Sequence, residues 1–155
     1  MESSELVENI YSRAVEGIQK NWFLNRNTDW YDYVVSLPIE LKITYLVIVV
    51  HNQVVNGGFH QYFVNGYGQF AKETIIALLD IGASKRAKLL EKSFEMVNND
   101  NISIEVFRER LLDKDIESFF ISDELYEPLD ELDTQYYNII DEEIDVLLGN
   151  YLGGR

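Results

Sequence analysis

The 155-residue chain has no cysteine, only two prolines and only 13 lysine and arginine residues. Without cysteine there is no disulfide, thiol nucleophile, iron–sulfur cluster or cysteine-ligated zinc finger. The absence suits a reducing compartment, and the acidic residues 1–5 form no secretory signal, so we expect a cytoplasmic protein. The longest apolar run, residues 45–50, is far shorter than the roughly 20 residues that cross a bilayer. We therefore expect no membrane association.

Acidic residues outnumber basic ones by two to one. Twenty-seven aspartates and glutamates give a net charge of −14 at pH 7. This charge repels nucleic acid phosphates and anionic headgroups, so we do not expect direct binding to nucleic acid. The length fits one domain, and 46% hydrophobic residues are enough to pack a core without disulfides or metals.

Apolar residues recur at intervals of three and four along nearly the whole chain, which is typical of amphipathic helices. Residues 45–50 are β-branched, so a buried strand remains an alternative there, but no turn residue interrupts 39–55. Ser3 or Ser4 is placed to cap the first helix and Ser103 a later one. The sequence predicts an all-α fold, a single compact domain of about seven helices over residues 1–155. The expected helical segments are 3–21, 38–56, 59–65, 70–82, 84–97, one after Ser103, 125–136 and 140–151, and residues 30–35 form a short aromatic segment that Pro38 ends.

Nearly all of the net charge belongs to the last quarter of the chain. Residues 113–155 carry 13 acids and two basic residues. If they share one face, that face has about one charge per 170 Å², within a factor of two of duplex DNA. Acids three or four residues apart on a helix lie about 5 to 6 Å from each other, as at Glu127 with Asp130 or Glu131, and at Asp141 with Asp145. A solvated helix face that serves solubility is the alternative. The candidate acids are Asp113, Asp115, Glu117, Asp123, Glu124, Glu127, Asp130, Glu131, Asp133, Asp141, Glu142, Glu143 and Asp145.

Residues 56–65 read NGGFHQYFVN and are followed by Gly68, Ala77, residues 81–83 and an LDxxYY segment at 132–137. This pattern resembles a bacterial DNA-mimic protein family of small acidic helical proteins with an NGGFxQYF core, over about residues 40–152. The N-terminal helix lies outside the resemblance. The resemblance implies an all-helical fold and an acidic surface that occupies the DNA site of a basic DNA-binding protein, such as a transcription factor or nucleoid protein. The resemblance is also compatible with a homodimer.

The shared motif is expected to be mainly structural. Gly57 and Gly58 suit a positive-φ turn and close helix packing, and the aromatic residues suit a core. The amides near the turn are expected to satisfy the loop's own backbone groups. A small-ligand site around Asn56, His60 and Gln61 is the alternative. The motif residues are Asn56, Gly57, Gly58, Phe59, Gln61, Tyr62, Phe63 and Asn65.

No enzymatic chemistry has a visible carrier in the sequence. His51 and His60 are nine residues apart, which is not the HExxH spacing of a zinc site, and no nucleophile elbow or GK[ST] phosphate loop occurs. Acids at 113, 115, 117 and 124 fit an EF-hand count, but position six is Ser118 where the loop needs glycine. We therefore expect no catalytic residue, no metal and no cofactor.

The sequence is compatible with three functions. The first is a non-enzymatic inhibitor or regulator that presents carboxylates in place of DNA phosphates. The second is an interaction or immunity-type module whose acids only keep it in solution. The third is a ligand-binding domain built around the turn at residues 56–61.

Overall fold

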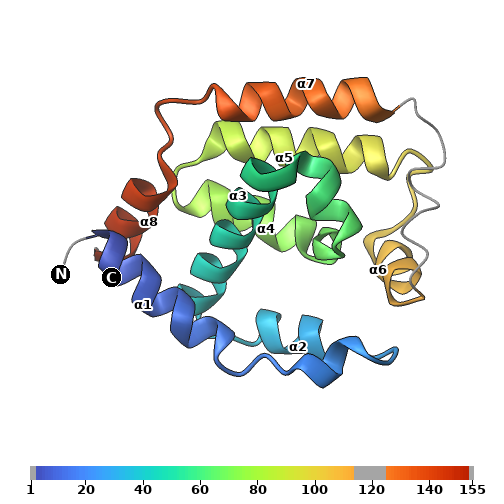
Figure 1. The fold of residues 1–155 in the computed structure, drawn as a ribbon, viewed down its shortest axis with the longest axis horizontal. Coiled ribbons are helices and arrows are strands. Elements are labelled where there is room, and N and C mark those ends of the chain that lie inside the picture. The colour runs from blue at the N-terminus through green and yellow to red at the C-terminus, as the bar shows by residue number, and fades with distance from the viewer. Residues whose placement is uncertain (1–2, 114–124, 154–155) are drawn as a thin grey trace.

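Helices account for all regular structure in the part of the chain that the structure describes, residues 3–113 and 125–153. In this computed structural model (Figure 1), these described residues form eight α-helices and two 3₁₀ helices, which confirms the all-α prediction. The elements are α1 (Ser3–Val15), η1 (Lys20–Phe23), α2 (Asp29–Val35), α3 (Ile39–Val64), η2 (Tyr67–Phe70), α4 (Ala71–Asp80), α5 (Ser84–Val97), α6 (Ile104–Leu112), α7 (Tyr126–Tyr137) and α8 (Ile144–Gly153).

The long helix α3 lies at the centre, with α1, α4, α7 and α8 packed around it (Figure 1). Its apolar run at residues 45–50 is helical and almost entirely buried, so the strand alternative was wrong. A helix that is apolar on all sides is stable only when other elements cover it. The β-branched composition of this run therefore reflects burial and not a strand.

Helix α3 is broken at the double glycine of the motif. Gly57 has non-helical dihedral angles (φ −152°, ψ 17°) and Gly58 has φ 76° with ψ −179°, so two helical segments meet at a sharp bend, as the sequence predicts. The backbone N–H of Phe59 then begins the second segment and donates a 2.8 Å hydrogen bond to the Asp133 carboxylate of α7. A Cβ on Gly58 would lie 2.2 Å from that carboxylate. The glycine therefore supplies both the left-handed backbone and the room that Asp133 needs.

Helix α1 ends at Val15, six residues earlier than the sequence predicts. The Tyr33 hydroxyl of α2 donates to the Ala14 carbonyl (2.6 Å) and accepts from the Gly17 N–H (3.2 Å). Tyr33 thus closes the helix end from another element, and its ring lies where a side chain at position 17 would be. The apolar periodicity continues to Ile18 because that residue still packs on the core outside the helix.

Two other helix ends test the sequence reasoning. The Ser103 side chain accepts a hydrogen bond from the Val106 N–H, so the predicted cap of α6 is confirmed. Helix α8 begins at Ile144 and not at 140, and Ile140 is 93% exposed. The chain at residues 139–143 is not helical because it turns Glu142 inward toward α5.

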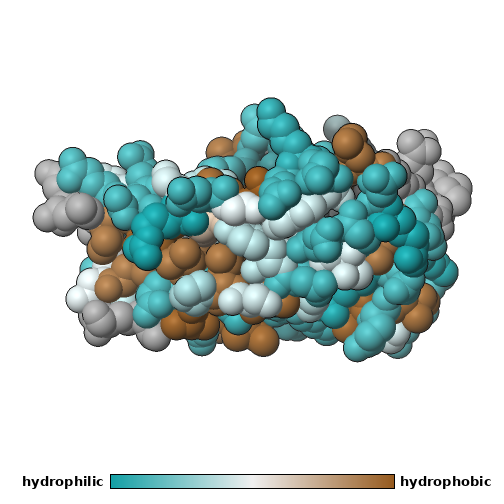
Figure 2. All heavy atoms as spheres, turned by 90° about the horizontal axis from the view of Figure 1, so that it is seen from below, coloured by the Kyte–Doolittle hydropathy of each residue, from teal (hydrophilic) through white to brown (hydrophobic). Residues whose placement is uncertain are grey.

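The two ends of the described chain meet on one side of the molecule, where α1 and α8 pack together (Figure 1). Figure 2 shows the molecule from below the view of Figure 1. Hydrophilic side chains cover most of the face seen there, and apolar side chains gather toward the left, the side on which α1 and α8 lie. Within the described residues, no helix combines the length and the apolar character that a bilayer span requires.

We predict that Gly58→Ala lowers the free energy of unfolding by about 2 to 3 kcal/mol, because a non-glycine residue is strained at this φ and the new methyl displaces the Asp133 carboxylate from the Phe59 N–H. Urea denaturation followed by circular dichroism measures the change. Gly153→Ala is the control, since no atom lies within 4 Å of the position that the added methyl group would take in α8. Equal stability of Gly58→Ala and the parent would contradict this account of the bend.

Candidate functional site

The outer face of α7 carries three acids side by side. Glu127, Asp130 and Glu131 are all exposed, and their spacing of three and four residues places them on one side of the helix, as the sequence predicts. The opposite side of α7 buries Leu129, Leu132 and Tyr136 against α3 and α5. We call Glu127, Asp130 and Glu131 the α7 acidic ridge.

Glu142 does not lie on the surface, in contrast to the sequence expectation. It is only 5% exposed, and its two carboxylate oxygens accept hydrogen bonds from the N–H groups of Lys85 (2.8 Å) and Arg86 (3.0 Å). These donors belong to the first turn of α5, whose N-cap residue, Ala83, has no side chain that can accept them. Glu142 therefore caps α5 from 57 residues away, and a carboxylate also interacts favourably with the positive end of the helix.

Arg86 completes this arrangement from the α5 side. Its guanidinium donates to the carbonyls of Glu142 (2.9 Å), Tyr136 (3.1 Å) and Ile139 (3.3 Å). It also lies 4.3 Å from the centroid of the Tyr136 ring. Tyr136 lies in the last turn of α7 and Ile139 two residues beyond its end, so the buried arginine adds hydrogen-bond donors to the carbonyls at the C-terminal end of this helix. We call Arg86 and Glu142 the α5–α7 clamp.

Asp133 is half-buried and also serves the fold. Its hydrogen bond from Phe59 holds the second segment of α3, as described above. Burial raises the pKa of Asp133 above its ordinary value, and the hydrogen bond from Phe59 partly offsets this effect. Only part of the Asp133 carboxylate is therefore available to a partner.

Two further candidate acids form ion pairs at the surface. Asp113 accepts from Arg26 Nε at 2.8 Å, and Glu109 pairs with the same guanidinium. Asp141 pairs with Lys85, and this interaction lowers the pKa of Asp141. Asp141 precedes α8, so it does not form the helical pair with Asp145 that the sequence suggests.

The candidate acids therefore separate into groups with different surroundings. Asp115, Glu117, Asp123 and Glu124 lie outside the described residues, as do most positions of the EF-hand count. Glu143 and Asp145 are exposed at the start of α8, a different helix from the one that carries the α7 acidic ridge. Among the described residues, the three ridge acids and these two form no ion pair with a lysine or arginine.

The motif amides bond to one another rather than to the backbone of the turn. Asn56 donates to Gln61 (3.0 Å), Gln61 donates to Gln53 (3.0 Å), and Asn65 donates to the same Gln53 oxygen (2.8 Å). This chain of amides joins the two segments of α3 across the bend. We expected these amides to bond to the backbone of the loop, and that expectation was wrong, because they bond to other side chains. The burial of Phe59, Tyr62 and Phe63 supports a structural role for the motif.

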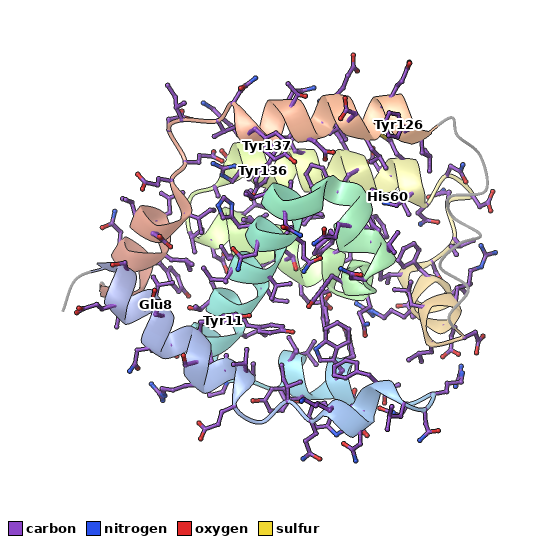
Figure 3. The ribbon with its side chains drawn as sticks, viewed as in Figure 1. Glu8, Tyr11, His60, Tyr126, Tyr136 and Tyr137 are labelled. Carbon is purple, nitrogen blue, oxygen red and sulfur yellow. The ribbon has the colours of Figure 1, made fainter. Side chains whose placement is uncertain are left out.

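The two histidines have different surroundings. His60 is exposed on the second segment of α3 (Figure 3). His51 is half-buried, and its Nδ1 lies 2.8 Å from the Tyr136 hydroxyl. Burial lowers the pKa of His51, and the nearby charge of Arg86 lowers it further. Within the described residues, no group of three or more histidine, aspartate or glutamate side chains is arranged to hold a metal ion.

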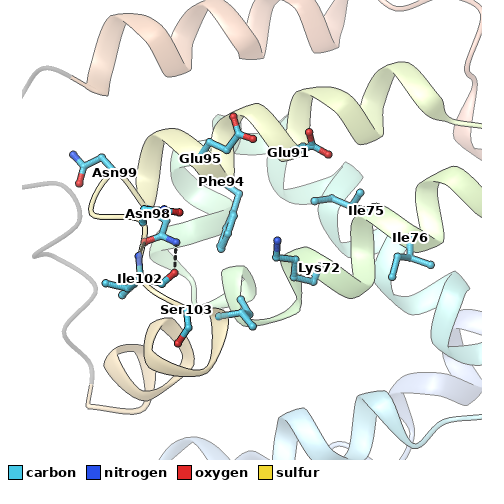
Figure 4. A pocket seen from close by; sticks show the side chains of 12 residues that line it. Lys72, Ile75, Ile76, Glu91, Phe94, Glu95, Asn98, Asn99, Ile102 and Ser103 are labelled. Atoms are coloured by element: carbon cyan, nitrogen blue, oxygen red, sulfur yellow. Dashed lines mark hydrogen bonds between the residues drawn. The ribbon is translucent and has the colours of Figure 1, made fainter.

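The structure contains cavities of about 760, 420 and 270 Å³. The cavity of about 760 Å³ is a groove between α4, α5 and the loop before α6, where Lys72 lies over the Phe94 ring and Asn98 donates to the Ile102 carbonyl (Figure 4). Asn56, His60 and Gln61 line none of these three cavities. The alternative of a small-ligand site around those residues therefore gains no support from them.

We predict that Glu142→Ala lowers the free energy of unfolding by about 2 to 3 kcal/mol, because two N–H groups at the start of α5 lose their acceptor in a buried place. Chemical denaturation measures this loss, and faster hydrogen exchange at Lys85 and Arg86 would locate it. Glu143→Ala is the matched control, since its exposed neighbouring carboxylate should change stability by less than about 0.5 kcal/mol. Equal effects of the two substitutions would show that Glu142 does not cap α5.

We also predict that His51 makes stability depend on pH. Its pKa is lower in the folded than in the unfolded chain, where it is near 6.5, so the unfolded chain binds the proton more readily. The contribution of neutral His51 to the free energy of unfolding is fully present above the pKa that His51 has in the unfolded chain. It is lost as the pH falls below that value. Between about pH 7.5 and pH 5.5, Tm should fall more for the parent than for His51→Gln. Parallel curves for the parent and His51→Gln would refute this.

Comparison with known proteins identifies one family for this chain. A family model described as "DMP19-like protein" matches residues 35–154, close to the range of 40–152 that the sequence resemblance covers. The match includes α3 to α8 and leaves out α1, η1 and all but the last residue of α2. No match was found among curated proteins or among solved structures. The chain belongs to the DMP19-like protein family.

Proposed function

We propose that this protein is a non-enzymatic DNA mimic, which presents carboxylates in place of DNA phosphates to a basic DNA-binding protein and so inhibits or regulates it. The observation that carries the proposal is the α7 acidic ridge, three exposed carboxylates in a row on one rigid helix. Membership of a family with which a DNA-mimic role is consistent supports the proposal. The partner is expected to be a transcription factor or a nucleoid protein.

The linear charge density of the ridge supports this function. The first and last acid of the ridge are four positions apart, which is about 6 Å along a helix axis, so the ridge averages one charge per roughly 3 Å of axis. One strand of B-DNA carries one charge per roughly 3.4 Å of axis. The ridge therefore matches one DNA strand over a short length, whereas the whole surface of 8639 Å² carries only about one net charge per 600 Å².

Exposed tyrosines stand at both ends of α7. Tyr126 is 74% exposed and Tyr137 is 51% exposed, although the Tyr137 hydroxyl donates to the Val54 carbonyl. Tyrosine supplies large contact area at little entropic cost and is enriched at the centres of protein interfaces. A partner that binds the α7 acidic ridge would therefore also contact the aromatic rings at its ends. If the protein is instead an interaction module whose acids only keep it in solution, its partner should depend mainly on these rings.

The test compares two variants with the same net charge. Glu127→Gln, Asp130→Asn and Glu131→Gln together neutralise the ridge, while Glu16→Gln, Asp29→Asn and Glu105→Gln neutralise three exposed acids on other elements. Each protein is immobilised and exposed to a lysate of the native host, and bound proteins are eluted by duplex DNA. We predict that the parent and the control variant both capture a basic DNA-binding protein. The Kd of that protein for the ridge variant should be at least about tenfold higher than its Kd for the parent.

The salt dependence separates the two remaining classes. Affinity of a DNA-mimic contact should fall steeply with salt, because the partner's basic groove exchanges its counterions for the carboxylates. A captured protein that binds this chain and duplex DNA at the same time would disprove the proposal. Equal capture by the ridge and control variants, with loss of capture on Tyr126→Ala, would favour the interaction-module alternative.

A further inference from the structure

Another cavity is lined by residues of α1, η1, α2, α3 and η2. Its volume is about 420 Å³, a size typical of small-molecule sites. Aromatic rings from five different elements line it, together with Val15, Ile18 and Asn65. We call this cavity the aromatic pocket, and its rings belong to Tyr11, Phe23, Trp30, Tyr45 and Tyr67.

The rings of the aromatic pocket are held in fixed relative orientations. Tyr11, on the side of α1 that faces α3 (Figure 3), stacks with Tyr45 at a centroid distance of 6.1 Å. The Trp30 ring is roughly perpendicular to Phe23 (5.1 Å) and to Tyr67 (5.2 Å). The Trp30 indole N–H donates to the Tyr45 hydroxyl at 3.1 Å. A ligand would therefore meet ring surfaces that are already positioned before it binds.

The electrostatics of the aromatic pocket favour a cation. Among the described residues, its lining contains no lysine, arginine or histidine to hold an anion and no carboxylate to form a salt bridge. Burial raises the pKa of the Tyr11 and Tyr67 hydroxyls, so both stay neutral at physiological pH. Aromatic faces attract cations through their quadrupoles, and the net charge of −14 on the chain draws cations to its surface.

A weakly hydrated cation fits this lining better than a metal ion or a primary ammonium. Metal ions need carboxylate, imidazole or several carbonyl ligands, and a primary ammonium needs strong hydrogen-bond acceptors, whereas the described lining offers only the Asn65 amide and neutral tyrosine hydroxyls. A methylated ammonium keeps its charge but requires neither, and aromatic surroundings are the usual way in which proteins bind it. We propose that the aromatic pocket binds a small molecule that carries a trimethylammonium group.

The test uses choline and its uncharged isostere 3,3-dimethyl-1-butanol, which have nearly the same shape and differ in charge. Each is titrated into the full chain at constant ionic strength, and the Trp30 indole N–H resonance reports binding by NMR. Trp22 does not line the pocket, so its indole signal is the internal reference. We expect choline to saturate the Trp30 shift with a Kd at least about threefold lower than that of the isostere.

Phe23→Leu tests whether the rings cause this preference. Leucine keeps an apolar side chain on η1 but removes the π face, so the affinity for choline should fall at least about twofold while that for the isostere stays unchanged. Leu24→Ala is the control, because Leu24 is exposed beside Phe23 and does not line the pocket. A melting curve establishes that both variants are folded.

Three results would overturn the proposal: tighter or equal binding of the isostere, no saturation of the Trp30 signal up to about 100 mM choline, or equal losses in Phe23→Leu and Leu24→Ala. A short peptide that contains trimethyllysine forms a third arm of the titration. Tighter binding of this peptide than of choline would assign the same chemistry to a modified protein side chain and overturn the small-molecule source.

Discussion

The fold depends on carboxylates that cap helices from distant parts of the chain. Asp133 of α7 binds the first N–H of the second α3 segment, and Glu142 binds two N–H groups at the start of α5. The residues that precede these two helix starts, Gly58 and Ala83, have no side chain that can accept these hydrogen bonds. Arg86 ties the same region to the end of α7. The C-terminal acids therefore hold together elements that lie far from them in sequence, in addition to giving the chain its charge.

Much of the fold follows from periodicity. The helices, the bend at Gly58 and the Ser103 cap are all local features, and the sequence predicts them because each depends on residues within one turn of the position concerned. The errors occur where tertiary contacts decide. Tyr33 ends α1 early, and the inward turn of Glu142 delays the start of α8. No local pattern indicates either contact, since each partner lies at least 16 residues away.

The candidate site was only partly predictable for the same reason. The spacing of Glu127, Asp130 and Glu131 predicts a shared face, and they do share one. Counting acids does not distinguish these three from Glu142, which has the same chemistry but is buried on the N-terminus of another helix. The aromatic pocket left no signal in the sequence, because its five rings come from five separate elements and each has an ordinary apolar spacing.

The packing of α1 against α8 extends beyond the region that the family model matches. Helix α1 lies outside the region that defines the family, yet its Val7 and Ala14 are buried, and α8 beneath it buries Ile144 and Leu148. The region that the family model matches is therefore smaller than the part of the chain that is needed to cover the hydrophobic core. A relative reduced to the shared region would expose the side of α8 that α1 covers here, and would have to shield it with another segment or with a second molecule.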